Sequence, residues 1–182
     1  MSLILPTFDK RIKPPLGTPL NPHLPINQGL VGFWPMNEGG GNIVRDVSGN
    51  EHVGSFVSSP TWTVTPRGHG LVFDGVDDYV DVGPVFYSRG VTCNAWIAVN
   101  STEGSFGWLG STDGSGDKQL CLGRAASFGA LHRIAWYIYN DAGSSTQATS
   151  DDRFEIPCVG MFTGTWDAAS GAMWMYWNGK LM

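Results

Sequence analysis

The chain has 182 residues, a length typical of one domain, of which 42% are hydrophobic and 15% are charged. Because ordinary soluble domains have about 25% charged residues, this composition favours an ordered chain with a weakly charged surface over a disordered one. The 25 glycines and the 12% aromatic content suit short strands joined by tight turns, and they suit long helices badly. We therefore expect an all-β protein.

Charge and hydropathy exclude several classes of function. The formal net charge is −5, and Lys and Arg are not clustered on any long segment, so the chain lacks the basic surface that binding to DNA or RNA requires. No apolar run approaches the ~18 residues of a membrane span. Pro6 and Asp9 interrupt the stretch in which a signal peptide would be continuously apolar. We predict no nucleic-acid partner, no membrane partner and no export signal.

Residues 1–27 have the composition of an extended, proline-rich arm. Six prolines occur in this stretch, and each removes a backbone donor and disfavours helical geometry at the preceding residue. The stretch is nevertheless too apolar for a solvated linker. We expect Lys10, Arg11 and Lys13 to face acidic surface or solvent. We expect the arm to dock on a neighbouring subunit through apolar side chains, including Leu5, Phe8, Ile12, Leu16 and Leu20.

The rest of the chain, residues 28–182, has the pattern of an antiparallel β-sandwich. Short β-prone runs are separated by clusters of Gly, Asn, Asp and Ser. In the run 91–99, alternation places Cys93 on one face and Asn94 and Trp96 on the other. Asn178-Gly179 fits a tight hairpin turn that needs positive φ twice. The predicted strands are 29–36, 52–57, 71–73, 79–82, 91–99, 118–123, 132–139, 159–166 and 172–177, and the aromatic residues expected to fill the core are Trp34, Phe73, Tyr79, Trp96, Trp136 and Trp166.

The three cysteines are predicted to be reduced and packed. Their number is odd and their spacing is wide, so they fit neither a disulfide framework nor a paired metal-binding knuckle. A free cysteine behaves as a small buried apolar side chain. The residues are Cys93, Cys121 and Cys158.

Three separated motifs occur in the order found in one known family. They are GLVGFWPMNEGGGN at 29–42, RDVSGN at 45–50 and LVFDGVDDYVDV at 71–82. Together they resemble the opening of the laminin-G-like, concanavalin A-like jelly-roll family, and the resemblance extends over residues 29–182. It implies a two-sheet antiparallel jelly-roll sandwich. Family members usually continue through two or three further strands after the Asn-Gly hairpin, so the resemblance implies that those strands are missing or supplied by a partner.

The segment 46–50 is a candidate site for a structural Ca²⁺ ion. Asp46 and Asn50 bring hard oxygens close together, which Ca²⁺ requires in sets of six to eight, and Asp77 is a third candidate ligand. The resembled family often uses this loop for calcium. The same pattern is also a stable turn, because Asp and Asn bond to nearby backbone and Gly accepts positive φ. Both interpretations stay open.

The carboxylates do not have the spacing of a catalytic pair. Retaining glycosidases, the enzymes nearest in fold, need two carboxyl groups about 5 Å apart. Asp77 and Asp81 would stand about 13 Å apart on one face of a strand. The four histidines have no nucleophile and carboxylate at a recognisable spacing. We predict that the chain is not an enzyme.

Aromatic side chains at adjacent strand positions predict an outer face that binds something. Outer rings suit stacking on a sugar or contact with another protein, and an overlying loop or the arm is the third explanation. The predicted stacking residues are Trp174, Tyr176 and Trp177.

The combination of the arm with the Gly29–Trp34 opening resembles phage-encoded jelly-roll proteins. The resemblance implies a non-catalytic structural or adhesion protein of the virion, assembled in the bacterial cytoplasm, that decorates the capsid or attaches at the tail. Its implied partners are other subunits, including copies of itself, and a surface glycan. The alternative is a soluble carbohydrate-binding module of a polysaccharide-processing system, and a glycosidase ranks third.

Overall fold

The computed structural model describes residues 13, 16–18, 20–21, 23–85, 90–100, 106–112, 118–125, 133–139, 145–150 and 157–182. These residues form thirteen strands, one 3₁₀ turn at Pro25–Asn27 and no α-helix. All strand pairs are antiparallel. The prediction of an all-β protein is confirmed. The chain divides into two compact units, Met1–Val85 and Phe86–Met182.

The first unit contains a small sheet and a hairpin. Strands β1 (Ile43–Val44), β2 (Gly54–Val57) and β5 (Tyr79–Asp81) form the sheet in the order β1-β2-β5. Strands β3 (Thr61–Thr65) and β4 (Gly68–Val72) form the hairpin. Val44 is fully buried, and the rings of Phe56 and Trp62 pack with their centroids 5.6 Å apart.

The predicted strand 29–36 does not form a strand. Its backbone groups bond instead to the loop that begins at Asp46: the Phe33 N–H donates to the Asp46 carboxylate, and the Val47 N–H donates to the Phe33 carbonyl. Because both backbone groups of Phe33 are already paired with this loop, they are not available for a strand ladder.

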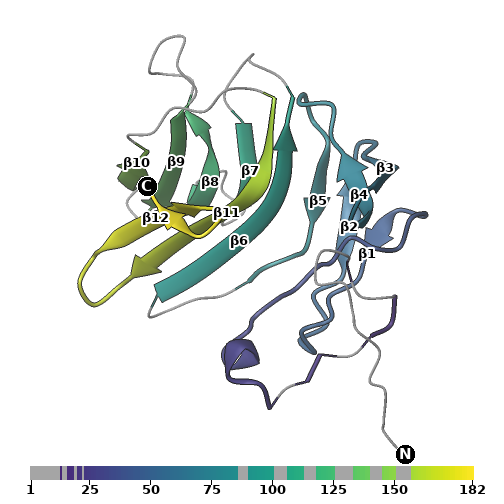
Figure 1. Ribbon diagram of the computed structural model, residues 1–182, viewed down its shortest axis with the longest axis horizontal. Helices are drawn as coiled ribbons and strands as arrows, with labels where there is room; N and C mark the ends of the chain where they lie inside the picture. Colours follow the sequence, from purple (N-terminus) through teal and green to yellow (C-terminus); the bar gives the residue numbers. More distant parts are fainter. Residues whose placement is uncertain are drawn as a thin grey trace, which may run out of the picture. The chain divides into compact units, whose positions relative to one another are not determined.

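The second unit is a sandwich of two four-stranded sheets (Figure 1). We call β13-β12-β11-β6 the C-terminal sheet; it consists of β6 (Gly90–Val99), β11 (Cys158–Asp167), β12 (Met173–Trp177) and β13 (Lys180–Leu181). We call β10-β9-β8-β7 the middle sheet; it consists of β7 (Phe106–Thr112), β8 (Lys118–Ala125), β9 (Arg133–Tyr139) and β10 (Ser145–Thr149).

The core of the second unit lies between these two sheets. Trp136 and Ile138 of β9 pack with Phe162 of β11 and Met175 of β12. The residues packed against this cluster include Val91, Cys93 and Ile97 of β6, together with Trp166, Met173 and Trp177. Along β6 and β11, inward residues alternate with outward ones, as the period of a strand requires.

Two glycines of β11 make room for tryptophan rings. A Cβ at Gly164 would lie 2.7 Å from the Trp136 ring, and a Cβ at Gly160 would lie 2.3 Å from the Trp177 ring. No real side chain tolerates such distances, so these positions accept only glycine unless the rings move.

The predicted set of core aromatics is partly wrong. Trp136 and Trp166 lie in or against the core, but Trp96 is exposed because alternation along β6 points it outward. Phe73 follows the end of β4, and Tyr79 is exposed on β5, so neither packs in the core. The Asn178-Gly179 turn is confirmed, with φ of 49° and 82°.

The cysteine predictions are answered for two of the three residues. Cys93 and Cys158 are free thiols, and Cys93 packs against the core of the second unit. The side chain of Cys121 lies outside the described residues.

Candidate functional site

The outer face of the C-terminal sheet combines aromatic rings with hydroxyl and amide groups. Alternation points one set of residues of each strand away from the core, and most of them are exposed. They are Thr92, Asn94, Trp96 and Ala98 of β6; Val159, Met161, Thr163 and Thr165 of β11; Trp174 and Tyr176 of β12; and Leu181 of β13. We call this set the outer platform.

None of the side chains of the outer platform is charged. Asp167, the last residue of β11, follows Thr165 on the same face, and its carboxylate is turned to the adjoining loop, where it accepts hydrogen bonds from the Ala169 N–H and from the backbone and hydroxyl of Ser170. These bonds, that of the Ser170 hydroxyl first, lower the pKa of the Asp167 carboxyl. The platform is therefore polar in part and aromatic in part, and the only charged group that adjoins it on the described part of β11 is the Asp167 carboxylate at its edge.

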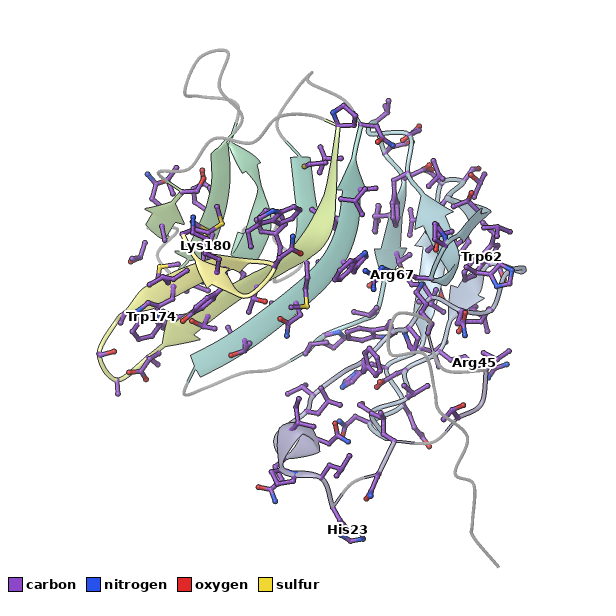
Figure 2. The ribbon with its side chains drawn as sticks, in the orientation of Figure 1. His23, Arg45, Trp62, Arg67, Trp174 and Lys180 are labelled. Carbon is purple, nitrogen blue, oxygen red and sulfur yellow. The ribbon has the colours of Figure 1, made fainter. Side chains whose placement is uncertain are left out.

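Strand register fixes the order of side chains on the platform. Trp174 pairs with Thr165, and Thr165 pairs with Thr92. In the next outward-facing row along β11, Tyr176, Thr163 and Asn94 lie side by side, and Met161 pairs with Trp96 in the row after that. The two tryptophans are thus at opposite corners of the platform. Figure 2 shows Trp174 on β12.

A hydrogen-bonded pair lies between the two tryptophans. The Thr163 hydroxyl donates to Asn94 Oδ1 at 2.6 Å. The Asn94 Nδ2 donor has no partner among the described residues and lies on an exposed side chain. An exposed amide donor and a row of hydroxyls next to half-exposed rings can bind a ligand that is apolar on one face and polar at its edges.

The structure separates the three predicted stacking residues. Trp174 and Tyr176 belong to the outer platform, and Trp174 is 41% exposed. Trp177 follows Tyr176 directly, so it points to the opposite face of the sheet. There it packs on the core, and the centroid of its ring lies 4.4 Å from the centroid of the Phe162 ring. Trp177 therefore does not share the outer platform with Trp174 and Tyr176, and the predicted stacking of all three on one ligand does not fit this face.

Sequence reasoning missed Trp96 as a site residue. The side chain is 48% exposed and lies on the same face as Trp174. The signal was present in the alternation of 91–99, which places Trp96 opposite to the inward-facing Cys93.

The predicted metal ligands Asp46, Asn50 and Asp77 divide between two loops of the first unit. Asp46 organises its own loop: it accepts hydrogen bonds from the Phe33 and Ser48 N–H groups through Oδ1, and from the Ser48 hydroxyl and the His52 N–H through Oδ2. Asn50 Nδ2 donates to the carbonyls of Leu30 and Val31. Burial raises the pKa of the Asp46 carboxyl, but the hydrogen bonds from Phe33, Ser48 and His52 outweigh burial and hold this pKa below its ordinary value.

Asp77 lies in a second loop together with Asp74 and Asp78. Carboxylate oxygens of these three residues lie within 4.8 Å of one another. Asp74 Oδ1 accepts hydrogen bonds from the N–H groups of Val76, Asp77 and Asp78, and Asp78 accepts from the N–H groups of Ser59 and Asp74. The loop of Asp74, Asp77 and Asp78, which we call the acidic turn, is thus stabilised by its own carboxylates. The binding of a calcium ion to this loop stays a prediction.

The arm residues are placed in part. Leu5, Phe8 and Ile12 lie outside the described residues, as do Lys10 and Arg11, whereas Leu16 is exposed and Leu20 is partly buried.

Lys13 is half-buried and bonds to backbone groups of the first unit. Its N–H donates to the Arg67 carbonyl, and its Nζ donates to the carbonyls of Met36 and His69. Burial lowers the pKa of Lys13, and the nearby Glu38 opposes that shift. The ammonium group of Lys13 therefore has one acidic neighbour, Glu38, in line with the prediction, and two backbone carbonyls of the same unit that replace part of the water that would otherwise solvate it.

A short ordered turn follows Lys13 and carries exposed apolar side chains. The Asn21 carbonyl accepts hydrogen bonds from the Leu24 N–H and from Asn27 Nδ2, and the Pro25 carbonyl accepts one from the Gln28 N–H. On this turn Ile26 is 85% exposed, and Leu24 is also exposed.

No family model matches the chain, and no curated protein or solved structure matches it significantly. The resemblance to the laminin-G-like family therefore depends on the sequence motifs alone. In the described part of the chain, no helix has the length and apolar character needed to cross a membrane.

Proposed function

We propose that this chain is a non-catalytic adhesion module, built on a jelly-roll sandwich, that binds its ligand on the outer platform and attaches to a larger assembly through its N-terminal segment. The observation that carries the proposal is the outer platform itself. Two half-exposed tryptophans flank exposed hydroxyl and amide groups on one rigid sheet. Rigid strands hold such groups with little loss of entropy on binding.

The acidic turn supports a role without catalysis. Asp74, Asp77 and Asp78 are as close as the carboxyl pair of a retaining glycosidase, but one member of such a pair must keep its proton near neutral pH. At Asp74, the hydrogen bond from the Val76 N–H, together with those from Asp77 and Asp78, lowers the pKa of the carboxyl, so Asp74 is unsuited to the role of the acid. Asp74 and Asp78 also accept backbone N–H groups, so they act as turn formers.

The N-terminal segment supports attachment to other subunits. Lys13 fixes the segment to the β3–β4 hairpin, and beyond this anchor Leu16, Leu24 and Ile26 are exposed. Exposed apolar side chains on an ordered turn are typical of protein contacts. The sequence resemblance favours a virion as the larger assembly. The chain would then decorate the capsid or attach at the tail, with further copies of itself among its partners.

The second candidate is a soluble carbohydrate-binding module of a polysaccharide-processing system. The uncharged character of the outer platform favours it, since neutral polysaccharides need stacking and hydrogen bonds rather than ion pairs. The two candidates share the binding face and differ in whether the chain belongs to a larger assembly.

A glycan array probed with the labelled full-length chain tests the shared binding face. We expect binding to at least one glycan and its loss in Trp174→Ala, with the fold unchanged by circular dichroism. Tyr79→Ala is the matched control, because Tyr79 is an exposed aromatic residue of the first unit. Binding that survives Trp174→Ala, or is equally lost in Tyr79→Ala, contradicts the proposed face. Co-sedimentation with virion particles then separates the two candidates.

A further inference from the structure

The register of the C-terminal sheet defines a distance between its two outer tryptophans. Trp174 lies in one row with Thr165 and Thr92, so two strand spacings separate it from β6. Trp96 lies four residues further along β6 than Thr92. With strands about 4.8 Å apart and about 3.3 Å per residue, the two positions are about 16 Å apart along a diagonal.

This diagonal passes over the polar pair. The row that holds Asn94 and Thr163 lies midway between the row of Trp174 and the row of Trp96. A ligand on the diagonal would therefore meet a ring at one end, a hydroxyl and an amide in the middle, and a second ring at the other end. Tyr176 adjoins Thr163 in the middle row and can extend the polar part with its hydroxyl.

These features select the class of ligand. Sugar rings have one face of C–H groups that stacks on an aromatic ring and edges of hydroxyls that hydrogen-bond. A carboxylate, sulfate or phosphate would lose its hydration on a face that provides no cation, and the net charge of −5 repels polyanions further. A protein partner would favour a continuous apolar centre, whereas here the centre is Asn94 and Thr163.

We propose that the outer platform binds an uncharged oligosaccharide lengthwise, with one sugar stacked on Trp174, another stacked on Trp96, and the Asn94–Thr163 pair bonding to the sugars between them. The inference rests on the proposed function and adds the ligand class, its direction and Trp96 as a binding residue. Successive sugars of an extended chain repeat at about the strand spacing, so the diagonal corresponds to about four sugars.

Titration calorimetry with uncharged β-1,4-linked glucose and N-acetylglucosamine oligomers, from disaccharide to hexasaccharide, tests the inference on the full-length chain. We expect affinity to rise up to about the tetrasaccharide and then to level off. Trp96→Ala should weaken tetrasaccharide binding by about three- to tenfold and leave disaccharide binding at Trp174 unchanged. Trp96→Tyr should restore most of the loss, and Tyr79→Ala is the control for an exposed ring elsewhere.

The outcomes distinguish this inference from the proposed function. Glycan binding that depends on Trp174 but not on Trp96, or that does not depend on chain length, overturns the inference and leaves the adhesion module standing. Binding of charged glycans only, or of a protein only, on the outer platform overturns the ligand class. If neither these oligomers nor any uncharged glycan of the array binds, the inference is wrong, and if no ligand of any class binds, the proposed binding face fails with it.

Discussion

Gly164 of β11 lies directly against the indole ring of Trp136 of β9, so that a Cβ at this glycine would stand 2.7 Å from Trp136 Cδ2. Trp136 is fully buried, and its Nε1 has no hydrogen-bond partner among the described residues. Packing therefore holds this ring between the two sheets of the second unit. The absence of a side chain at Gly164 is what allows the sheets to approach at this point.

Gly164→Ala is expected to lower the free energy of unfolding by about 1–3 kcal/mol, because the added methyl group overpacks the core. Denaturant unfolding measures the change. In a Trp136→Phe background the same substitution should cost less, since the smaller ring leaves space for the methyl group. Gly40→Ala is the control, as nothing lies within 4 Å of the position that its Cβ would take and its φ lies outside the left-handed region. Equal costs in both backgrounds would show that the ring does not limit the approach.

Asp46→Asn is expected to reduce stability at neutral pH and to flatten its dependence on pH in acid. The native hydrogen bonds hold the pKa of Asp46 below its ordinary value of 3.8 despite the opposing effect of burial, so the unfolded chain binds the proton more tightly. The stabilisation is present above pH 3.8 and is lost as the pH falls through the lower native pKa. Unfolding free energies measured from neutral pH down to about pH 2 test this. Parallel curves for the two proteins would contradict it.

Cys93 is expected to resist thiol reagents in the native protein. It faces the core on β6, and burial raises its pKa to about 12, so almost no reactive thiolate exists at neutral pH. Cys158 is less buried, and its pKa is raised to a smaller extent, so it should react faster. Maleimide labelling followed by peptide mass spectrometry compares the two sites before and after unfolding. Rapid native labelling of Cys93 would show that the sandwich opens readily.

Ile26→Ser is expected to abolish attachment to the larger assembly without changing stability, because the side chain is 85% exposed within this chain. Lys13→Met is expected to loosen the segment from the hairpin, because it removes the hydrogen bonds from Nζ to the Met36 and His69 carbonyls. Hydrogen exchange of residues 16–30 reports the release, and co-sedimentation with assembled particles reports attachment. Unchanged attachment of Ile26→Ser would leave the turn without a role in docking.

Calcium at millimolar concentration is expected to raise the melting temperature relative to chelator, and Asp77→Asn is expected to remove the rise. Asp77 contributes a carboxylate to the acidic turn, while no described side chain or backbone group donates a hydrogen bond to that carboxylate. Asp46→Asn shows which of the two loops binds calcium. The Asp46 carboxylate is already saturated with internal hydrogen bonds, so this substitution should leave the rise in melting temperature in place. Equal melting temperatures in calcium and in chelator would show that both loops are turns only.

Local features of the second unit could be predicted from the sequence. The alternation of 91–99 correctly separates the face of Cys93 from the face of Trp96, because successive side chains of a strand must point to opposite sides. The positive φ of Asn178 and Gly179 follows from the needs of a tight hairpin turn. The same reasoning failed for residues 29–36, where a single carboxylate, Asp46, competes with strand pairing for the backbone.

The candidate site was decided by the tertiary structure. Which of Trp174, Tyr176 and Trp177 face outward depends on which side of β12 meets the middle sheet, and the aromatic run itself is ambiguous on that point. The placement of Trp96 at one corner and Trp174 at the other depends on the pairing of β6 with β11 and of β11 with β12. That register joins residues as far apart in sequence as Asn94 and Thr163, and it is set by long-range packing around Trp136 and Phe162 rather than by any local pattern.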